Sequence, residues 1–316
     1  MHRSTAVTTE EDLHDTDERD EEEEDDEEEE DIFAKLLESP EPHKDHRTMQ
    51  LTSEERQWAL DLKRTVEQDH AELHNLSDME YAVYAIISQG NRADALTRMG
   101  AIQMFREEYQ VDNSIEQGVY MLGELMKQQE GLLLCLDVDS ATLEGLHVMD
   151  IGALNPQAAL APCFISGVDY NWRIMVCGFY YYNLACQPCL GTVRAGNHTM
   201  ADFVGWGWHH MNMEIQYRFS GEMFAHYPIK FTKMCCYNTN QAANIVWSLV
   251  KNVYPSSLMN VLQLGCQIPS ESYEEAPKSL SERYLQPDLN QACLRMLTRA
   301  NSLLTLRCRN DELFRL

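Results

Sequence analysis

Cys186 and Cys189 form a C-x-x-C pair, a spacing used by thiol oxidoreductases and, when a second pair is present, by zinc sites. A redox pair of this kind follows a strand and opens a helix, whereas Cys186 follows a long apolar and aromatic segment. A second C-x-x-C does not occur. We therefore expect structural cysteines, with a thiol oxidoreductase and a metal site as the alternatives.

Two acids, Asp137 and Asp139, follow the apolar run Leu132–Leu136. In phosphatases such a pair supplies a nucleophilic carboxylate and a proton donor. The position two residues after Asp139 holds Ala141, where Thr or Val is usual, and we find no later lysine and paired-acid motif. The acids are therefore expected to cap a turn.

Three histidines, His198, His209 and His210, are candidate metal ligands. Adjacent histidines point in different directions, and neither H-x-x-x-H nor H-E-x-x-H occurs. The sequence also lacks G-x-S-x-G, G-x-x-x-x-G-K-[ST] and G-x-G-x-x-G. We therefore expect a protein that is not an enzyme and that has no cofactor and no metal ion.

The charge of the 316-residue chain argues against one class of partner. There are 51 acidic and 25 basic residues, a net charge of −26, so binding to nucleic acid phosphates is not expected. The segment Glu10–Asp31 has 18 acids and one base. Residues 1–47 are accordingly predicted to be a disordered acidic tail, which either keeps the chain soluble or serves as an arm for a protein partner and repels anionic membranes.

The beginning of the chain also predicts a location. Met1–Thr9 has one arginine and no apolar segment of the kind found in signal peptides. Ten cysteines are few for a disulfide-stabilised chain of this length. We therefore expect a cytosolic or nuclear protein.

In the rest of the chain, the pattern of apolar and polar residues changes near residue 131. Residues 50–130 are predicted to be a helical N-lobe, with capping-box patterns at Thr52–Glu55 and Ser77–Glu80. Within 131–270, short apolar runs alternate with helical patterns, which indicates an α/β fold with a mixed, mostly parallel sheet. The expected strands are at 132–136, 146–151, 198–203, 230–237 and 261–264, and the expected helices are at 172–182, 212–226 and 241–253. Residues 271–316 read as a connector and a C-terminal amphipathic helix.

Large, soft apolar side chains are concentrated in the predicted helices of the second half. One interpretation is an ordinary core, because such stripes are typical of packed helices. The other is an apolar ligand cavity between a sheet and helices, since methionine and aromatic side chains form adaptable apolar surfaces.

A set of motifs then favours the cavity. Ala201–Trp208 resembles the strand and turn "hhDhxGhxW" of CRAL-TRIO (Sec-fourteen-like) lipid-binding domains. The segments His226–Phe231, Ile245–Tyr254 and Val261–Gly265 are similar to the following "YP-hRhK", "hhKPhL" and "IhhLG" motifs. Upstream, Leu146–Pro156 resembles the first strand and its exit, and residues 92–109 resemble a "W-R-x-x-Y" helix with Phe105 for Trp. The resemblance covers about residues 50–270.

The resemblance implies a sheet as cavity floor, helices as roof and a mobile gate helix at 241–253. It implies non-enzymatic binding, and possible transfer between membranes, of a phospholipid or other small hydrophobic ligand, with a membrane surface as a transient partner. The resemblance thus implies a cytoplasmic protein that is peripheral to membranes. On this analogy we expect the cavity to be lined by Phe179, Tyr182, Phe203, Trp206, Met223, Ile245, Trp247 and Leu249. Lys230 and Lys251 are expected either to meet a lipid phosphate or to lie on the surface.

Four positions depart from the family pattern. Members that bind phosphatidylinositol have Glu and Lys where this chain has Ile229 and Asn260, which puts recognition of an inositol headgroup in doubt. The prolines at both ends of the gate are replaced by Asn240 and Asn252. The alternative function is therefore a scaffold that uses the same fold without bound lipid, beside the oxidoreductase noted above.

Overall fold

Helices make up the beginning of the described chain. The computed structural model describes residues 51–70, 72–73, 76–139, 141–218, 227–251, 254, 256–268 and 278–304, so the predicted acidic tail lies outside the described residues. The helices are α2 (Ser53–Asp69), α3 (Asp78–Ile87), α4 (Arg92–Glu108) and α5 (Ile115–Gln128).

Both predicted capping boxes are present. In α2, the Glu55 amide donates to Thr52 Oγ1 (3.2 Å), and the Thr52 amide donates to the Glu55 carboxylate (2.9 Å). Ser77 and Glu80 make the same reciprocal pair at the start of α3. Each box satisfies helix amides that have no carbonyl partner within the helix, and so fixes where the helix begins.

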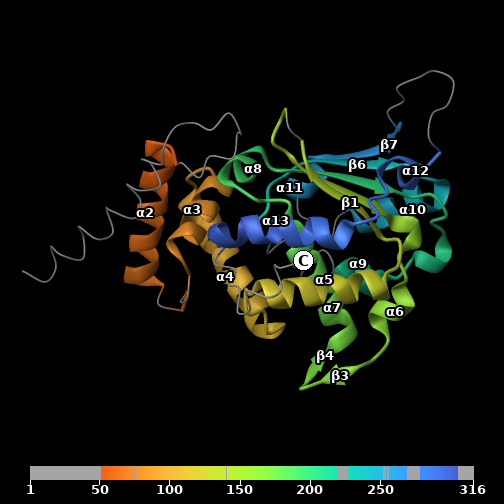
Figure 1. The fold of residues 1–316 in the computed structure, drawn as a ribbon, viewed down its shortest axis with the longest axis horizontal. Helices are drawn as coiled ribbons and strands as arrows, with labels where there is room; N and C mark the ends of the chain where they lie inside the picture. Colours follow the sequence, from red (N-terminus) through yellow and green to blue (C-terminus); the bar gives the residue numbers. More distant parts are fainter. Residues whose placement is uncertain are drawn as a thin grey trace, which may run out of the picture.

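A five-stranded sheet follows, with strand order β1-β2-β5-β6-β7. The strands are β1 (Leu133–Val138), β2 (Gly145–Asp150), β5 (Asn197–Asp202), β6 (Phe231–Tyr237) and β7 (Leu262–Cys266). Strand β1 is antiparallel to β2, and the other neighbours are parallel. This confirms the predicted α/β class with a mostly parallel sheet. Figure 1 shows the sheet on one side of the molecule and helices α2–α4 on the other.

The connecting helices place one central helix beneath the sheet. They are α6 (Pro156–Leu160), α7 (Tyr170–Ala185), α8 (Leu190–Ala195), α9 (Met213–Arg218), α10 (Gln241–Val250) and α11 (Ser256–Met259). Helix α7 is the predicted buried aromatic helix, and its residues from Ile174 onward are buried. It packs closely on α5, because a Cβ atom on Gly178 would lie 2.6 Å from Leu125 Cβ.

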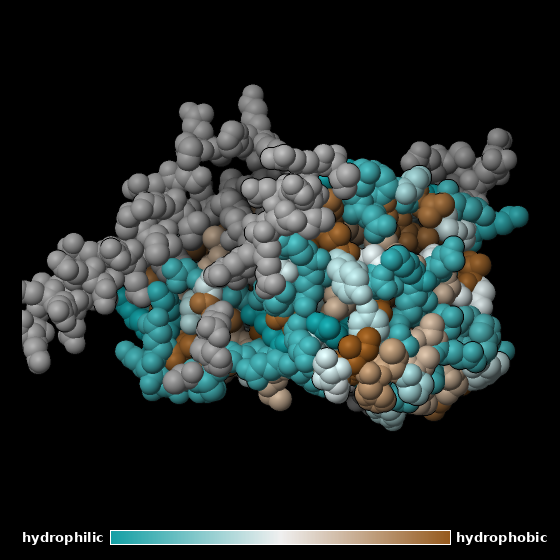
Figure 2. All heavy atoms as spheres, turned by 60° about the horizontal axis from the view of Figure 1, so that its bottom comes forward, coloured by the Kyte–Doolittle hydropathy of each residue, from teal (hydrophilic) through white to brown (hydrophobic). Residues whose placement is uncertain are grey.

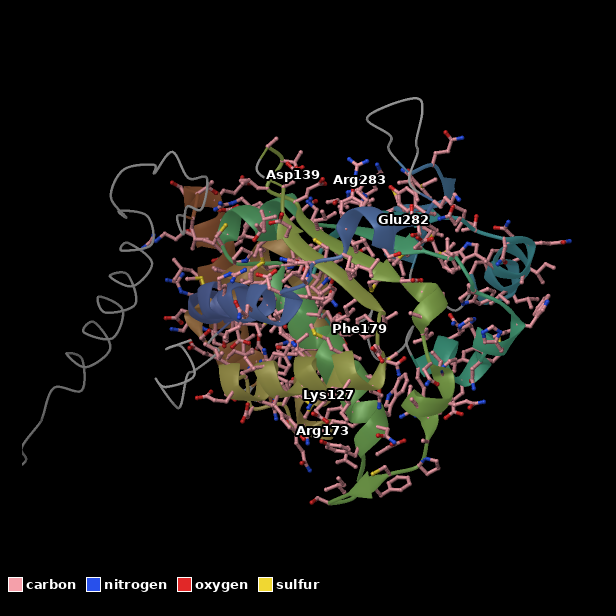
Figure 3. All side chains as sticks on the ribbon, turned by 45° about the vertical axis from the view of Figure 1, so that its right-hand side comes forward. Lys127, Asp139, Arg173, Phe179, Glu282 and Arg283 are labelled. Atoms are coloured by element: carbon pink, nitrogen blue, oxygen red, sulfur yellow. The ribbon has the colours of Figure 1, made fainter. Side chains whose placement is uncertain are left out.

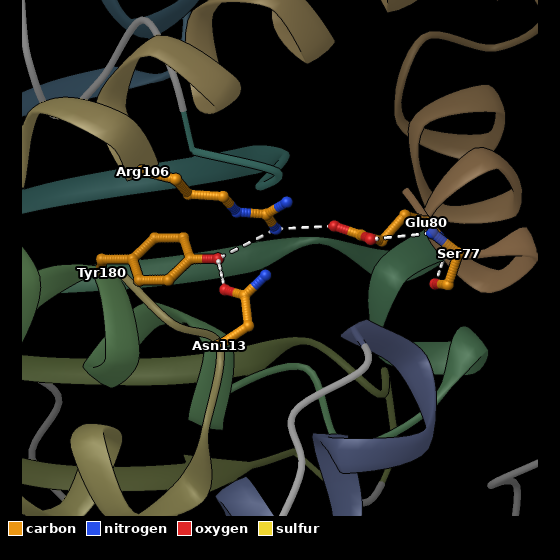
Figure 4. Close-up of polar contacts among 5 residues, drawn as sticks. All are labelled: Ser77, Glu80, Arg106, Asn113 and Tyr180. Atoms are coloured by element: carbon orange, nitrogen blue, oxygen red, sulfur yellow. Dashed lines mark hydrogen bonds and ion pairs between the residues drawn. The ribbon is translucent and has the colours of Figure 1, made fainter. Parts of the chain in front are cut away.

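A buried ion pair joins the N-terminal helices to α7 (Figure 4). Arg106 of α4 donates to the carboxylate of Glu80 (2.6 Å) and to the Tyr180 hydroxyl of α7 (3.3 Å). The hydroxyl also lies 3.2 Å from the side-chain amide of Asn113. Because Glu80 is fully buried, the pair fixes how α3, α4 and α7 meet.

The C-terminal helices cover two sides of the sheet region. Helix α13 (Leu289–Leu304), the predicted terminal helix, packs against α5, α7 and β1 (Figure 1). Helix α12 (Leu280–Tyr284) lies on the sheet face opposite α7, where Leu280 packs with Val148 and Met200. Among the described residues, no helix is both long enough and apolar enough to cross a bilayer.

A small hairpin, formed by β3 (Phe164–Ile165) and β4 (Val168–Asp169), projects at the bottom of Figure 1 beside the N-terminal end of α7. Its side chains Phe164 and Ile165 are 71% and 52% exposed. Figure 2 turns the end of the molecule that carries the hairpin forward, and apolar residues gather there in a patch on a mostly hydrophilic surface. The sequence analysis did not predict this hairpin.

Candidate functional site: an apolar cavity

One face of the sheet forms the floor of a cavity. Side chains alternate along a strand, so every second residue points to this face. The floor residues pair across the strands in two rows: His147, Thr199, Met234 and Leu262 in one, and Met149, Ala201, Cys236 and Leu264 in the other. The intervening residues pack against α12 on the other face.

Helices cover the cavity on the side opposite the sheet. Helix α7 contributes Phe179 and Asn183, and α9 contributes Ile215. Helix α10 contributes Ala243 and Val246. Figure 3 shows Phe179 in the interior, between α7 and the sheet, while the labelled charged side chains Asp139, Arg173 and Arg283 lie at the periphery. The remaining lining is mostly apolar and aromatic, and includes Phe203, Trp206, Tyr227, Trp247, Tyr254 and Leu258.

The cavity has a volume of about 170 Å³. A single water molecule needs about 10–15 Å³ on the same scale, so there is room for on the order of ten non-hydrogen atoms. Among the described lining residues none has a charged side chain, and burial lowers the pKa of His147 to about 3, which keeps its ring neutral. The space is therefore suited to an apolar molecule.

Helix α10 has apolar side chains on both of its faces. Ala243 and Val246 are buried toward the cavity, whereas Ile245 and Leu249 are 41% and 57% exposed. The helix begins at Asn240, whose Oδ1 accepts from the Ala243 amide (2.9 Å) and whose Nδ2 donates to the Trp206 carbonyl (2.6 Å). Its N-terminal end is thus attached to the turn after β5, although the proline of the family motif is absent.

Four of the predicted ligand-lining residues come together in the cavity: Phe179, Phe203, Trp206 and Trp247. Met223 lies outside the described residues. The others lie elsewhere, for reasons that differ between them.

Tyr182 lies outside the lining because its hydroxyl donates to the Cys135 carbonyl (2.6 Å) and its ring packs on His147, which turns it toward β1 and β2. Ile245 and Leu249 lie outside it because they are on the solvent face of α10.

The two lysines also lie away from the cavity lining. Lys230 Nζ donates to the Arg194 carbonyl (3.2 Å), and Lys251 is exposed at the end of α10. Neither lysine lines the cavity, and contact of either one with a lipid phosphate stays a prediction.

The structure adds polar lining residues that the sequence analysis did not select: His147, Asn183, Thr199, Gln216, Thr239 and Asn244. For His147 and Thr199 the signal is present in the sequence as the alternation of side chains along β2 and β5, whereas Asn183 lies on α7. The analysis chose large apolar residues and therefore passed over polar positions on the same face.

The C-x-x-C pair is buried between α7 and α8. Cys186 is fully buried and Cys189 nearly so, and burial raises the pKa of the Cys186 thiol well above its usual value. Since the thiolate is the reactive form, this environment opposes redox or nucleophilic chemistry. It supports the structural interpretation of these cysteines.

Two of the other chemical candidates, Asp139 and His210, make local hydrogen bonds, whereas His198 Nε2 is buried with no hydrogen-bond partner among the described residues. Asp139 accepts from the amides of Ala141 (2.8 Å) and Thr142 (2.7 Å), which is the predicted turn cap. His210 Nδ1 accepts from the Gly207 amide (3.0 Å). Within the described ranges, no group of three or more His, Cys, Asp or Glu side chains is placed to hold a metal ion.

Comparison with known proteins does not assign the chain to a family. Neither a protein-family model nor a curated protein sequence matches the chain significantly. The crystal structure of Sfh5 is similar with a TM-score of 0.42 and 10% sequence identity, over 78% of this chain and 97% of Sfh5. Similarity at this level establishes neither a family nor a function.

Proposed function

We propose that this chain binds a hydrophobic molecule, either a small apolar ligand or the acyl part of a lipid, in the cavity between the sheet and α7, α9 and α10. The observation that carries the proposal is the uncharged, mainly apolar lining around about 170 Å³ of space. The sequence resemblance to CRAL-TRIO domains leads to the same ligand class. In this proposal the protein is a non-enzymatic carrier.

The energetics of burial favour such a role. Transfer of each CH₂ group from water into an apolar site contributes about 0.8 kcal/mol, so a ten-carbon chain gains roughly 8 kcal/mol before the costs of binding. A bilayer offers a similar gain to the same chain. A carrier therefore needs a closed, dry site and a means of opening it.

We infer that α10 opens the cavity when this helix contacts a membrane surface. Ala243 and Val246 line the cavity, while Ile245 and Leu249 face outward on the same helix. Insertion of the outer side chains into the membrane interface would compensate for moving the inner ones away from the cavity. On this basis the protein would be peripheral to membranes and would transfer its ligand there.

Lipid extraction and mass spectrometry of the purified chain test the proposal. We expect a stoichiometric hydrophobic ligand. Ala243→Trp places a large ring in the cavity and should remove most of the bound ligand. Ser248→Trp puts the same ring on the exposed side of α10 and should retain it.

Circular dichroism and thermal unfolding of both variants distinguish loss of ligand from loss of fold. A folded wild-type protein that contains no lipid and takes none from vesicles would contradict the proposal and favour the scaffold interpretation. Equal ligand content in the two tryptophan variants would place any bound lipid outside this cavity.

A further inference from the structure

Two polar side chains stand side by side on the otherwise apolar floor. His147 of β2 and Thr199 of β5 are partners in the strand register, and both line the cavity. Thr199 is only 1% exposed, and its Oγ1 has no hydrogen-bond partner among the described residues. Burial of an unpaired hydroxyl is unfavourable, so the presence of threonine at this buried position calls for a functional explanation.

The surrounding groups can complete a hydrogen-bonding site of zero charge. The His147 ring is neutral, so it offers one donor and one acceptor, and its Nε2 lies 3.4 Å from Asn197 Nδ2. Above it on α7, Asn183 also lines the cavity. The Asn183 Nδ2 donates to the Phe179 carbonyl (2.7 Å), a bond that does not use its Oδ1.

The lack of charged side chains in the described lining restricts which polar group a bound ligand can carry. Among the described lining residues there is no lysine or arginine to meet a carboxylate or a phosphate. A buried anion without a cation is strongly unfavourable. A buried hydroxyl or carbonyl needs only a hydrogen bond, which Thr199 Oγ1 can supply.

We propose that the ligand is a neutral lipid with one uncharged oxygen group, a hydroxyl or a carbonyl, which enters the cavity first and forms a hydrogen bond with Thr199 Oγ1. This inference rests on the proposed function and specifies its ligand. The hydrocarbon part then lies along Met149, Ala201 and Cys236 toward α10.

Binding of three matched probes to the delipidated full chain tests the inference: decanol, decane and decanoate. In the wild-type protein we expect decanol to bind about three- to tenfold more tightly than decane, which corresponds to one hydrogen bond. Decanoate at pH 7 should bind more weakly than decanol, because its charge has no counterion in the cavity.

Two variants of Thr199 locate the contact. Thr199→Val keeps the shape of the side chain and should remove the preference for decanol over decane. Thr199→Ser keeps a hydroxyl and should retain the preference. Because the Thr199 hydroxyl has no partner among the described residues, the valine variant is expected to fold normally.

The outcomes separate this inference from the proposed function. If decane binds as tightly as decanol, or if Thr199→Val keeps the preference, the headgroup inference is wrong while the apolar site remains. If decanoate binds most tightly, the ligand is an anion and the inference is also wrong. If none of the probes binds, the cavity is not a ligand site and both proposals fail.

Discussion

His147 shows how one buried residue links the cavity to the stability of the fold. Burial is the main cause that lowers its pKa to about 3, compared with about 6.5 in the unfolded chain. Between these two values the unfolded chain binds a proton that the native state does not. Above pH 6.5 His147 therefore does not make the free energy of unfolding depend on pH. Below pH 6.5 the free energy of unfolding decreases as the pH falls toward 3.

Replacement of His147 by Gln should make the protein less sensitive to acid. Between pH 7 and pH 5, the free energy of unfolding of the wild-type protein should fall by about 2 kcal/mol more than that of the variant. Urea unfolding at the two pH values measures this difference. An equal loss in both proteins would mean that His147 is protonated in the native state.

At the same scale, the sequence predicted some cavity residues and not others. Phe203 and Trp206 could be placed because they belong to a recognisable strand and turn. Tyr182 could not, since its side-chain direction depends on a hydrogen bond to Cys135, which is distant in the sequence. Ile245 was assigned to the lining from the family analogy and its apolar character, although the positions of Ala243 and Val246 on α10 place it on the opposite side.

Among the elements, the contact between α5 and α7 determines how the roof of the cavity is held. A Cβ atom on Gly178 would lie 2.6 Å from Leu125 Cβ and 3.1 Å from the Met121 carbonyl oxygen. The backbone oxygen cannot move without displacing α5. Helix α7 can therefore approach α5 this closely only with glycine at the contact.

Gly178→Ala should consequently lower the free energy of unfolding by about 1–3 kcal/mol through overpacking. The matched control is Gly123→Ala in α5, where the added Cβ meets nothing within 4 Å. There the change should stabilise the protein by roughly 0.5–1 kcal/mol, because alanine is the better helix former. Chemical denaturation of the two variants should give shifts of opposite sign, and shifts of the same sign would refute the close packing.

Most elements follow from local patterns. The capping boxes at Thr52 and Ser77 and the apolar run of α7 are local signals, and the structure confirms them. The β3–β4 hairpin was missed because each strand has only two residues, too few for an alternating pattern. The pairing of β1 with β2 as an antiparallel edge likewise depends on contacts that single segments do not encode.

For the whole molecule, the essential feature is that the two sheet faces differ. One face packs against α12, and the other leaves an uncharged space beneath α7 and α10. The sequence predicted the α/β class and a cavity, but the volume of the cavity depends on how the side chains pack. Trp206 and Trp247 line this space, whereas Trp208 is 58% exposed. The fluorescence of these tryptophans can therefore report whether a ligand occupies the cavity.

The most direct test of the account is quenching of tryptophan fluorescence by a decanol that carries bromine at its far end. We predict saturable quenching in the delipidated wild-type protein and in Trp208→Phe. The double variant Trp206→Phe, Trp247→Phe should lose most of it. Quenching that is absent, or that disappears with Trp208 instead, would contradict a ligand site inside the cavity.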